Sequence, residues 1–201
     1  MADVSTALLL SGGMDSIALA WWLRPELALT INYGQRPAAA EIRASQAAAD
    51  SIGIQHHVIG ADLSSLGSGD LSGSAPLGIA PVTEWWPFRN QMLITLAAMR
   101  GVSLGVTRLL IGTVKSDSAH ADGTVAFIKS MNDLLCLQEG GITLEAPAIA
   151  LSACELLHSS AIPMEILAWA HSCHVANEPC GYCRGCRKHY ETLMEFGVAP
   201  Y

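Results

Sequence analysis

The first sixty residues alternate between short apolar runs and longer segments in which apolar residues recur at helical spacing. The apolar runs over residues 5–10, 27–33 and 56–59 predict buried β-strands. Residues 16–23 and 38–52, which lie between those runs, predict helices. Strand, helix, strand, helix, strand is typical of a parallel sheet with helices on its faces, so the pattern predicts an α/β fold.

The alternation resumes after a long irregular segment. Residues 60–84 are rich in Gly, Pro and Ser and show little periodicity, which is typical of a functional loop. Beyond this loop the pattern predicts strands over residues 109–111 and 142–145, and helices over residues 90–100, 124–139, 152–158, 163–170 and 187–196. We expect an α/β domain over residues 1–150 and a helical segment over residues 151–201, packed together as one unit.

Composition and charge exclude several classes of protein. Hydrophobic residues make up 51% of the 201 residues and charged residues 14%, so the chain is not a disordered polar protein. The net charge of −7 argues against a stable nucleic-acid partner, because neutralising phosphates requires a surplus of Lys and Arg. Mean hydropathy is +0.34, yet no apolar run reaches the roughly 18 residues of a membrane span. The acidic start Met1-Ala2-Asp3 does not resemble a secretory signal, so we expect a cytoplasmic protein with no membrane partner.

Four of the six cysteines fall within fourteen residues, in the pattern C-x6-C-x2-C-x2-C: Cys173, Cys180, Cys183 and Cys186. In a reducing compartment such spacing favours a metal over disulfides, and four thiolates suit a closed structural Zn²⁺ site. An Fe–S site would suit the same four ligands, and free thiols remain open. His174 and His189 are the alternative ligands. Cys136 and Cys154 stand alone in apolar surroundings, so we expect buried thiols there.

A glycine-rich turn follows the first predicted strand directly. It reads Ser11-Gly12-Gly13-Met14-Asp15-Ser16 and leads into a helix, whose unpaired N–H groups and positive dipole end attract phosphate. The glycines let the backbone approach an anion, and the serines supply hydroxyl donors. Asp15 would orient the loop or help to hold Mg²⁺. The turn is neither GxxxxGK[ST] nor GxGxxG, and an ordinary capped turn is the alternative interpretation.

The string over residues 11–16 resembles the PP-loop of the N-type ATP pyrophosphatases, which grip the pyrophosphate of ATP and transfer AMP to a substrate oxygen. With the C-terminal cysteine spacing, the chain resembles the QueC family, the 7-cyano-7-deazaguanine synthases. Further segments similar to that family follow in order: Asn32-Tyr33-Gly34-Gln35-Arg36 with Glu41 after it, Leu63-Ser64-Ser65-Leu66, Pro87-Phe88-Arg89-Asn90, Ile111-Gly112, Asp122, and Glu178-Pro179-Cys180-Gly181.

The resemblance implies a Rossmann-like, doubly wound parallel sheet of the PP-loop ATPase type, with a small C-terminal helical zinc-binding region. It implies catalytic roles for Ser11, Asp15, Ser16 and Arg89. It implies ATP contacts from Leu10, Ser11, Gly12, Gly13, Asp15, Ser16, Tyr33, Gln35 and Gly112. It implies substrate contacts from Gln35, Arg36, Arg89, Asn90, Asp117 and Asp122. The implied cofactors are ATP, Mg²⁺ and Zn²⁺, the last held by Cys173, Cys180, Cys183 and Cys186.

The implied reaction is the adenylation of 7-carboxy-7-deazaguanine by ATP, attack by ammonia to give an amide, and a second adenylation that drives dehydration to a nitrile. The resemblance also implies a homodimer. Two departures concern the later steps. Residues 118–123 read Ser-Ala-His-Ala-Asp-Gly in place of a segment that usually holds Tyr and Pro, and residues 149–157 lack a Lys that the family usually carries.

These departures keep an alternative open. QueC-like relatives in antiviral operons resemble this chain, and such a ligase would join the activated deazaguanine acid to an amine such as a protein N-terminus. Two further alternatives are less favoured. One is another PP-loop reaction, such as tRNA thiolation, and the other is a nucleotide-binding protein without catalytic activity.

Overall fold

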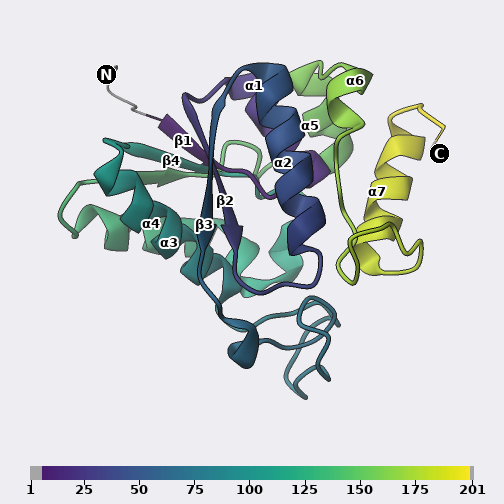
Figure 1. Cartoon of the computed structure of the whole chain (residues 1–201), viewed down its shortest axis with the longest axis horizontal. Coiled ribbons are helices and arrows are strands. Elements are labelled where there is room, and N and C mark those ends of the chain that lie inside the picture. Colours follow the sequence, from purple (N-terminus) through teal and green to yellow (C-terminus); the bar gives the residue numbers. More distant parts are fainter. Residues whose placement is uncertain (1–5, 200–201) are drawn as a thin grey trace.

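The computed structural model describes residues 6–199; the acidic start at Met1–Asp3 and the first residue of the predicted opening strand lie outside that range. Five parallel strands form one sheet in the order β3-β2-β1-β4-β5 (Figure 1). Their bounds are β1 Thr6–Leu9, β2 Leu27–Asn32, β3 Gln55–Gly60, β4 Arg108–Ile111 and β5 Thr143–Glu145. The predicted parallel α/β sheet is confirmed, and the order shows that the chain winds in both directions from β1.

Helices cover both faces of this sheet (Figure 1). One face carries α1 Met14–Leu23, α2 Ala38–Ile52, α5 Ala153–Ser160, α6 Met164–Leu167 and α7 Arg184–Glu195. The other face carries α3 Arg89–Ser103 and α4 Val125–Cys136. Each face has its own hydrophobic cluster of buried side chains. Strands with apolar residues on both faces fit between these clusters, which explains the continuous apolar runs in the sequence.

The C-terminal helices share the core of the first face. Leu156 of α5, Leu167 of α6 and Leu193 of α7 belong to the same cluster as Ile17 of α1 and Leu110 of β4. Side chains on α7 therefore have a fixed position relative to the start of α1. None of the helices within residues 6–199 is long and apolar enough to cross a membrane.

The long loop between β3 and α3 is irregular, as predicted, apart from a 3₁₀ turn at Ser64–Leu66. Backbone hydrogen bonds hold it in place: Arg36 N donates to Leu71 O at 2.8 Å, and Asp70 N donates to Thr83 O at 2.8 Å. Near its end Trp86 is buried against Tyr33, with ring centroids 5.0 Å apart. These contacts position the last residues of the loop beside the sheet.

Four predicted helix boundaries are wrong by three residues. α6 ends at Leu167 rather than residue 170. α3 runs through Gly101 to Ser103, because the missing side chain of Gly101 allows close packing against Val106 and Ile142. α4 ends at Cys136 rather than residue 139, and Cys136 is exposed rather than buried. Cys154 is buried, as expected.

The fourth of these boundaries is the start of α7, which begins at Arg184 instead of residue 187. Cys183 is its N-cap, and the Sγ atom of Cys183 accepts a hydrogen bond from Cys186 N. The first turn of the helix is thus built from the cysteine cluster itself. Two 3₁₀ turns, Lys115–Ala119 and Ala121–Gly123, interrupt the predicted polar loop after β4.

Candidate active site

A cavity of about 310 Å³ opens at the carboxyl ends of the central strands. β1 and β4 are neighbours there, and the chain winds away from them in opposite directions, which is where ligands bind in doubly wound sheets. The lining comes from β1, β2 and β4, the loop before α3, and the C-terminal segment. Its polar residues include Ser11, Asp15, Ser16, Glu41, Glu84, Arg89, Asn90, Asp117, His120, His171, Ser172, His174, Arg184, Lys188 and His189.

The turn over residues 11–16, here called the PP-loop, forms one wall of this cavity. Ser11 Oγ and Ser16 Oγ lie 3.1 Å apart, and Ser16 Oγ donates to Gly13 O at 2.9 Å. Gly12 has a φ of +76°, and a Cβ there would lie 2.6 Å from the carbonyl oxygen of Glu41. Only glycine fits this backbone position. The turn therefore aims both serine hydroxyls and the first turn of α1 at one point.

Lys188 brings a positive charge to the PP-loop from the other end of the chain. Its Nζ lies 2.8 Å from Asp15 Oδ2 and 3.4 Å from Asp117 Oδ1. Burial raises the pKa of Asp15, and the Lys188 charge opposes that rise. Burial lowers the pKa of Lys188, but the charges of the two carboxylates raise it by more. The net pKa lies above the usual value of lysine, so the ammonium is retained. A cation thus sits between two carboxylates next to the serine hydroxyls.

One helical turn earlier, Arg184 contacts a second buried carboxylate. Its Nη1 donates to Glu84 Oε1 at 2.6 Å, and His120 Nε2 lies 3.7 Å from the same oxygen. Burial alone would raise the pKa of Glu84, but the nearby His120 imidazole and the Arg184 charge hold it at about 2. Glu84 is therefore an ionised carboxylate with only 4% of its surface exposed.

Within residues 6–199, three buried side-chain polar atoms lack a hydrogen-bond partner: Asp15 Oδ1, Glu84 Oε2 and His174 Nδ1. All three residues line the cavity. Buried polar atoms are rarely left unpaired, because the cost of removing them from water is then not recovered. A polar ligand in this cavity would supply the missing partners.

Most of the predicted ATP and substrate residues line the cavity: Leu10, Ser11, Gly13, Asp15, Ser16, Tyr33, Arg89, Asn90, Gly112 and Asp117. Four do not: Gly12, Gln35, Arg36 and Asp122. Gly12 packs behind the turn, and its carbonyl accepts from His171 N at 2.8 Å. Arg36 is exposed.

Asp122 caps α3 instead of facing the cavity. Its Oδ2 accepts from Asn90 N at 3.3 Å, and its carbonyl accepts from Asn90 Nδ2 at 3.2 Å. Gln35 is buried, and its side chain donates to Glu41 Oε2 at 2.7 Å and to Ile31 O at 3.1 Å and accepts from Tyr33 N at 2.8 Å. Neither side chain reaches the cavity in this structure, so any effect of Gln35 there would act through Glu41.

Burial also controls the ionisation of two lining residues beside Arg89. It raises the pKa of Glu41 to about 7, against the hydrogen bond from Gln35 and the Arg89 charge. It raises the pKa of Tyr33 as well, so that phenol stays neutral. This wall of the cavity is thus only weakly negative, which suits an anionic ligand near Arg89.

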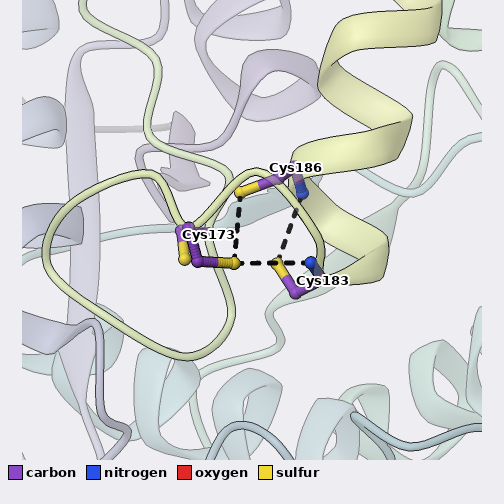
Figure 2. A group of neighbouring side chains, drawn as sticks. Cys173, Cys183 and Cys186 are labelled. Carbon is purple, nitrogen blue, oxygen red and sulfur yellow. Dashed lines mark hydrogen bonds between the residues drawn. The ribbon is translucent and has the colours of Figure 1, made fainter.

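The four predicted metal ligands meet beside the first turn of α7. Figure 2 shows Cys173, Cys183 and Cys186 gathered there, and with Cys180 their Sγ atoms all lie within 4.8 Å of one another. A tetrahedral site with sulfur ligands at about 2.3 Å has sulfur–sulfur edges of about 3.8 Å. Cys180 Sγ and Cys186 Sγ lie 3.8 Å apart. The donor set fits one Zn²⁺ ion, and the short spacing disfavours a polynuclear Fe–S cluster, whose ligands bind different irons.

The alternative ligands His174 and His189 lie outside this group of four sulfurs and line the cavity instead. His189 Nδ1 is 2.9 Å from Ser172 Oγ. Backbone N–H groups support the cysteines: His174 N donates to Cys183 Sγ and Cys183 N to Cys180 Sγ, both at 3.4 Å. Such bonds favour thiolate over thiol, as a metal requires.

Sequence reasoning missed Glu84, Arg184 and Lys188. Glu84 belongs to a segment with no motif of its own, and the cysteine motif around Arg184 and Lys188 predicts only a metal site. Each finds its partner far along the chain, 100 residues away for Glu84 and Arg184 and 173 for Lys188 and Asp15. One sequence signal could have linked Arg184 to Lys188. A helix that starts just after Cys183 places residues 184 and 188 on the same face.

A family model described as "Queuosine biosynthesis protein QueC" matches residues 5–197. Proteins named 7-cyano-7-deazaguanine synthase are similar over almost their whole length. That of Chlorobaculum parvum is 30% identical over 98% of this chain and 94% of that protein. That of Chlorobium luteolum is 31% identical over 97% and 94%, and that of Methanosarcina barkeri 27% identical over 94% of each.

Among solved structures, the NMN synthetase of Francisella tularensis resembles this chain with a TM-score of 0.50 at 12% sequence identity. The match covers 100% of this chain and 80% of that one. At that identity the likeness bears on the fold alone, and it agrees with the doubly wound sheet.

Proposed function

Because this chain belongs to the QueC family, we propose that it activates the carboxylate of 7-carboxy-7-deazaguanine with ATP and converts it, through an amide, to the nitrile. The observation that carries the proposal is the convergence of the two PP-loop serines, Asp15 and Lys188 at one end of a cavity large enough for a small ligand. The relatives named 7-cyano-7-deazaguanine synthase supply the choice of substrate.

ATP would bind with its pyrophosphate over the PP-loop. The N-cap of α1 is Gly13, which has no side chain to occupy the first free N–H groups of the helix. Those N–H groups, the hydroxyls of Ser11 and Ser16, and the Lys188 ammonium all favour an anion at this place. They would stabilise the negative charge that grows on the leaving pyrophosphate.

Mg²⁺ is the usual companion of ATP, and it would neutralise phosphate charge when bound. Asp15 and Asp117 supply the carboxylate oxygens that this ion prefers, and Asp15 Oδ1 is buried without a partner. The donor set therefore fits a magnesium site. Lys188 lies between the same two carboxylates and keeps them in place.

In the first step a carboxylate oxygen of the substrate attacks the α-phosphorus of ATP and the bond to the β-phosphate oxygen breaks, which gives an acyl adenylate and pyrophosphate. Ammonia then attacks the acyl carbon, loses a proton and displaces AMP, which leaves a primary amide. A second ATP adenylates the amide oxygen with release of pyrophosphate. Loss of AMP and the remaining nitrogen-bound protons yields the nitrile.

Arg89, at the first position of α3, would hold the reacting carboxylate. Its Nε donates to Asn90 Oδ1 at 3.3 Å, and it lines the cavity beside the neutral phenol of Tyr33. A fixed guanidinium positions a carboxylate well, because its planar donors match the two oxygens.

The zinc site would act through structure. Four cysteine ligands leave no open coordination position, so the ion supplies folding energy and no Lewis-acid step. The segment that carries the cysteines is hydrogen-bonded to the PP-loop and to the first turn of α2. His171 N donates to the PP-loop at Gly12 O, and Asn177 Oδ1 accepts from Ala40 N at 2.9 Å.

The position of Lys188 bears on the choice between a nitrile and a conjugate. Residues 149–157 lack the lysine that raised doubt about the second half of the reaction. A cation stands beside the PP-loop nevertheless, supplied from α7. This removes the missing lysine as an objection to the second adenylation that the nitrile requires.

The test is to incubate the zinc-loaded protein with ATP, Mg²⁺, 7-carboxy-7-deazaguanine and ammonium, and to follow pyrophosphate and the products by mass spectrometry. We expect the nitrile, with two pyrophosphates released for each. Accumulation of the amide or adenylate would support the conjugating ligase. Absence of pyrophosphate release from folded, zinc-loaded protein would overturn the proposal.

A further inference from the structure

We propose that Glu84 recognises the hydrogen-bond donor edge of the deazaguanine base, its ring N–H together with the adjacent exocyclic amino group. This inference rests on the proposed function, because it takes the 7-deazaguanine acid as the ligand, and it assigns a residue that fixes which base the site accepts. Neither the loop that carries Glu84 nor its partner Arg184 belongs to a motif that predicts this role.

The chemistry of Glu84 requires donors. It is an ionised carboxylate with 4% of its surface exposed, and its Oε1 is already bound by Arg184 at 2.6 Å. Its Oε2 is buried and has no hydrogen-bond partner. An ionised carboxylate only accepts hydrogen bonds, so a ligand that completes it must present N–H or O–H groups. A guanine-type edge presents two parallel N–H donors, which is the pattern a carboxylate accepts.

The location of Glu84 fits the length of the substrate. Arg184 and Lys188 are four residues apart on α7, so they stand on one face with their Cα atoms about 6 Å apart along the helix axis. Arg184 contacts Glu84, and Lys188 contacts Asp15 of the PP-loop. Two residues spaced along α7 by roughly the length of a fused bicyclic ring thus contact Glu84 and the PP-loop respectively. In 7-carboxy-7-deazaguanine the carboxyl group and the donor edge lie at opposite ends of that ring system.

The surroundings of Glu84 are rigid. Asp70 N donates to Thr83 O at 2.8 Å, and Thr83 Oγ1 donates to Asp70 Oδ2 at 2.8 Å, immediately before Glu84. Trp86, two residues later, is buried against Tyr33. A carboxylate whose neighbours on both sides are held in place can discriminate between bases, because it cannot move to bind a base that presents a different hydrogen-bonding edge.

The test combines a change in the ligand with a change in the protein. The ligands are 7-carboxy-7-deazaguanine and its analogue without the 2-amino group, and the proteins are the wild type and Glu84→Gln. Binding is measured by calorimetry without ATP, and kcat/KM by pyrophosphate release. We expect removal of the amino group to weaken wild-type binding about 100-fold, since a buried acceptor then loses its donor. We expect the same removal to cost Glu84→Gln less than about threefold.

Glu165→Gln is the matched control, because Glu165 is exposed on α6 and does not line the cavity. It should discriminate as the wild type does. If Glu84 only held the loop in place, both ligands would lose affinity equally and their ratio would stay at the wild-type value, which would overturn the inference. Equal binding of both ligands to the wild type would overturn it without any variant, even if Glu84→Gln failed to fold.

The outcomes separate this inference from the proposed function. If the wild type binds the deazaguanine acid with this discrimination but releases no pyrophosphate, the recognition by Glu84 stands and the adenylation is wrong. If pyrophosphate is released and the ratio of affinities does not depend on Glu84, the adenylation stands and the recognition is wrong. If the wild type neither binds nor turns over the acid, both are wrong.

Discussion

Lys188 Nζ lies 2.8 Å from Asp15 Oδ2, although 173 residues separate them in the sequence. The contact joins the second residue of α1 to the fifth residue of α7. It places a positive charge where the PP-loop would hold the phosphates of ATP. Two parts of the molecule that the sequence presents separately, the glycine-rich turn and the cysteine cluster, thus form one site.

We expect Lys188→Met to lower kcat/KM for pyrophosphate release by about 10²–10³-fold, the usual cost of removing one charged or polar group that stabilises a transition state. Lys188→Arg should retain part of the activity, because the charge stays and only its geometry changes. The measurement is initial-rate pyrophosphate release at saturating ATP.

Lys129→Met is the matched control for this prediction. Lys129 lies on α4 and makes an exposed pair with Asp133 at 3.2 Å, away from the cavity. It should keep wild-type rates. Full activity of a folded Lys188→Met protein would contradict the role given to Lys188.

Removal of the metal should inactivate the enzyme before it unfolds the sheet. Cys183 is both a proposed zinc ligand and the N-cap of α7, the helix that carries Arg184 and Lys188. We expect Cys183→Ser, or treatment with a strong chelator, to lower pyrophosphate release at least about tenfold, as loss of support for a site commonly does. Zinc content and circular dichroism would be measured on the same samples.

Cys136→Ser provides the comparison, because Cys136 is exposed at the end of α4 and is not one of the four clustered cysteines. That variant should bind one zinc and react as the wild type does. A Cys183→Ser protein without zinc but with normal pyrophosphate release would show that the metal does not position α7.

The buried carboxyl group of Glu41 should make the stability of the folded protein depend on pH. Burial raises its pKa to about 7 in the folded protein, above its ordinary value of 4.5. Folding therefore favours the protonated form, and the stability of the wild type should fall as pH rises from about 4.5 to 7 and then level off. We expect Glu41→Gln to remove this penalty and to raise the free energy of unfolding at pH 8 by on the order of 1 to 3 kcal/mol. Urea denaturation at pH 5.5 and pH 8 measures it.

The direction of the stability change at pH 8 decides whether Glu41 is destabilising in its ionised form. Glu165→Gln, which removes the same charge from an exposed site on α6, should leave the pH dependence unchanged. If Glu41→Gln were less stable than the wild type at pH 8 and equal to it at pH 5.5, the carboxylate would be ionised and stabilising in the fold, contrary to its burial.

The fold and the PP-loop wall of the cavity were predictable because their signals are local. A buried strand followed by two glycines and a helix is a pattern within a dozen residues, and the residues it singled out, Ser11, Asp15 and Ser16, line the cavity. The cysteine spacing is equally local, and the four sulfurs do converge. Strand order was not predictable, since no residue pattern specifies which strands are neighbours.

The remaining half of the cavity depends on long-range packing. Glu84 resembles any polar residue at the end of a loop until Arg184, 100 residues later, is placed beside it. Gln35 shows the opposite case. The resemblance of residues 32–36 to the QueC family implied that it contacts a ligand, yet it is buried and its amide is used by Ile31, Tyr33 and Glu41. Only the packed structure decides which polar residues of a motif face the cavity.

The most direct test of the central claim follows oxygen from the substrate into AMP. The protein is given ATP, Mg²⁺, ammonium and 7-carboxy-7-deazaguanine whose carboxylate carries ¹⁸O, and the AMP is examined by mass spectrometry. Activation through an acyl adenylate and then through the adenylated amide predicts that each carboxylate oxygen ends in an AMP, so that both AMP molecules formed per nitrile carry ¹⁸O. Unlabelled AMP, or ADP in its place, would contradict adenylation of the carboxylate.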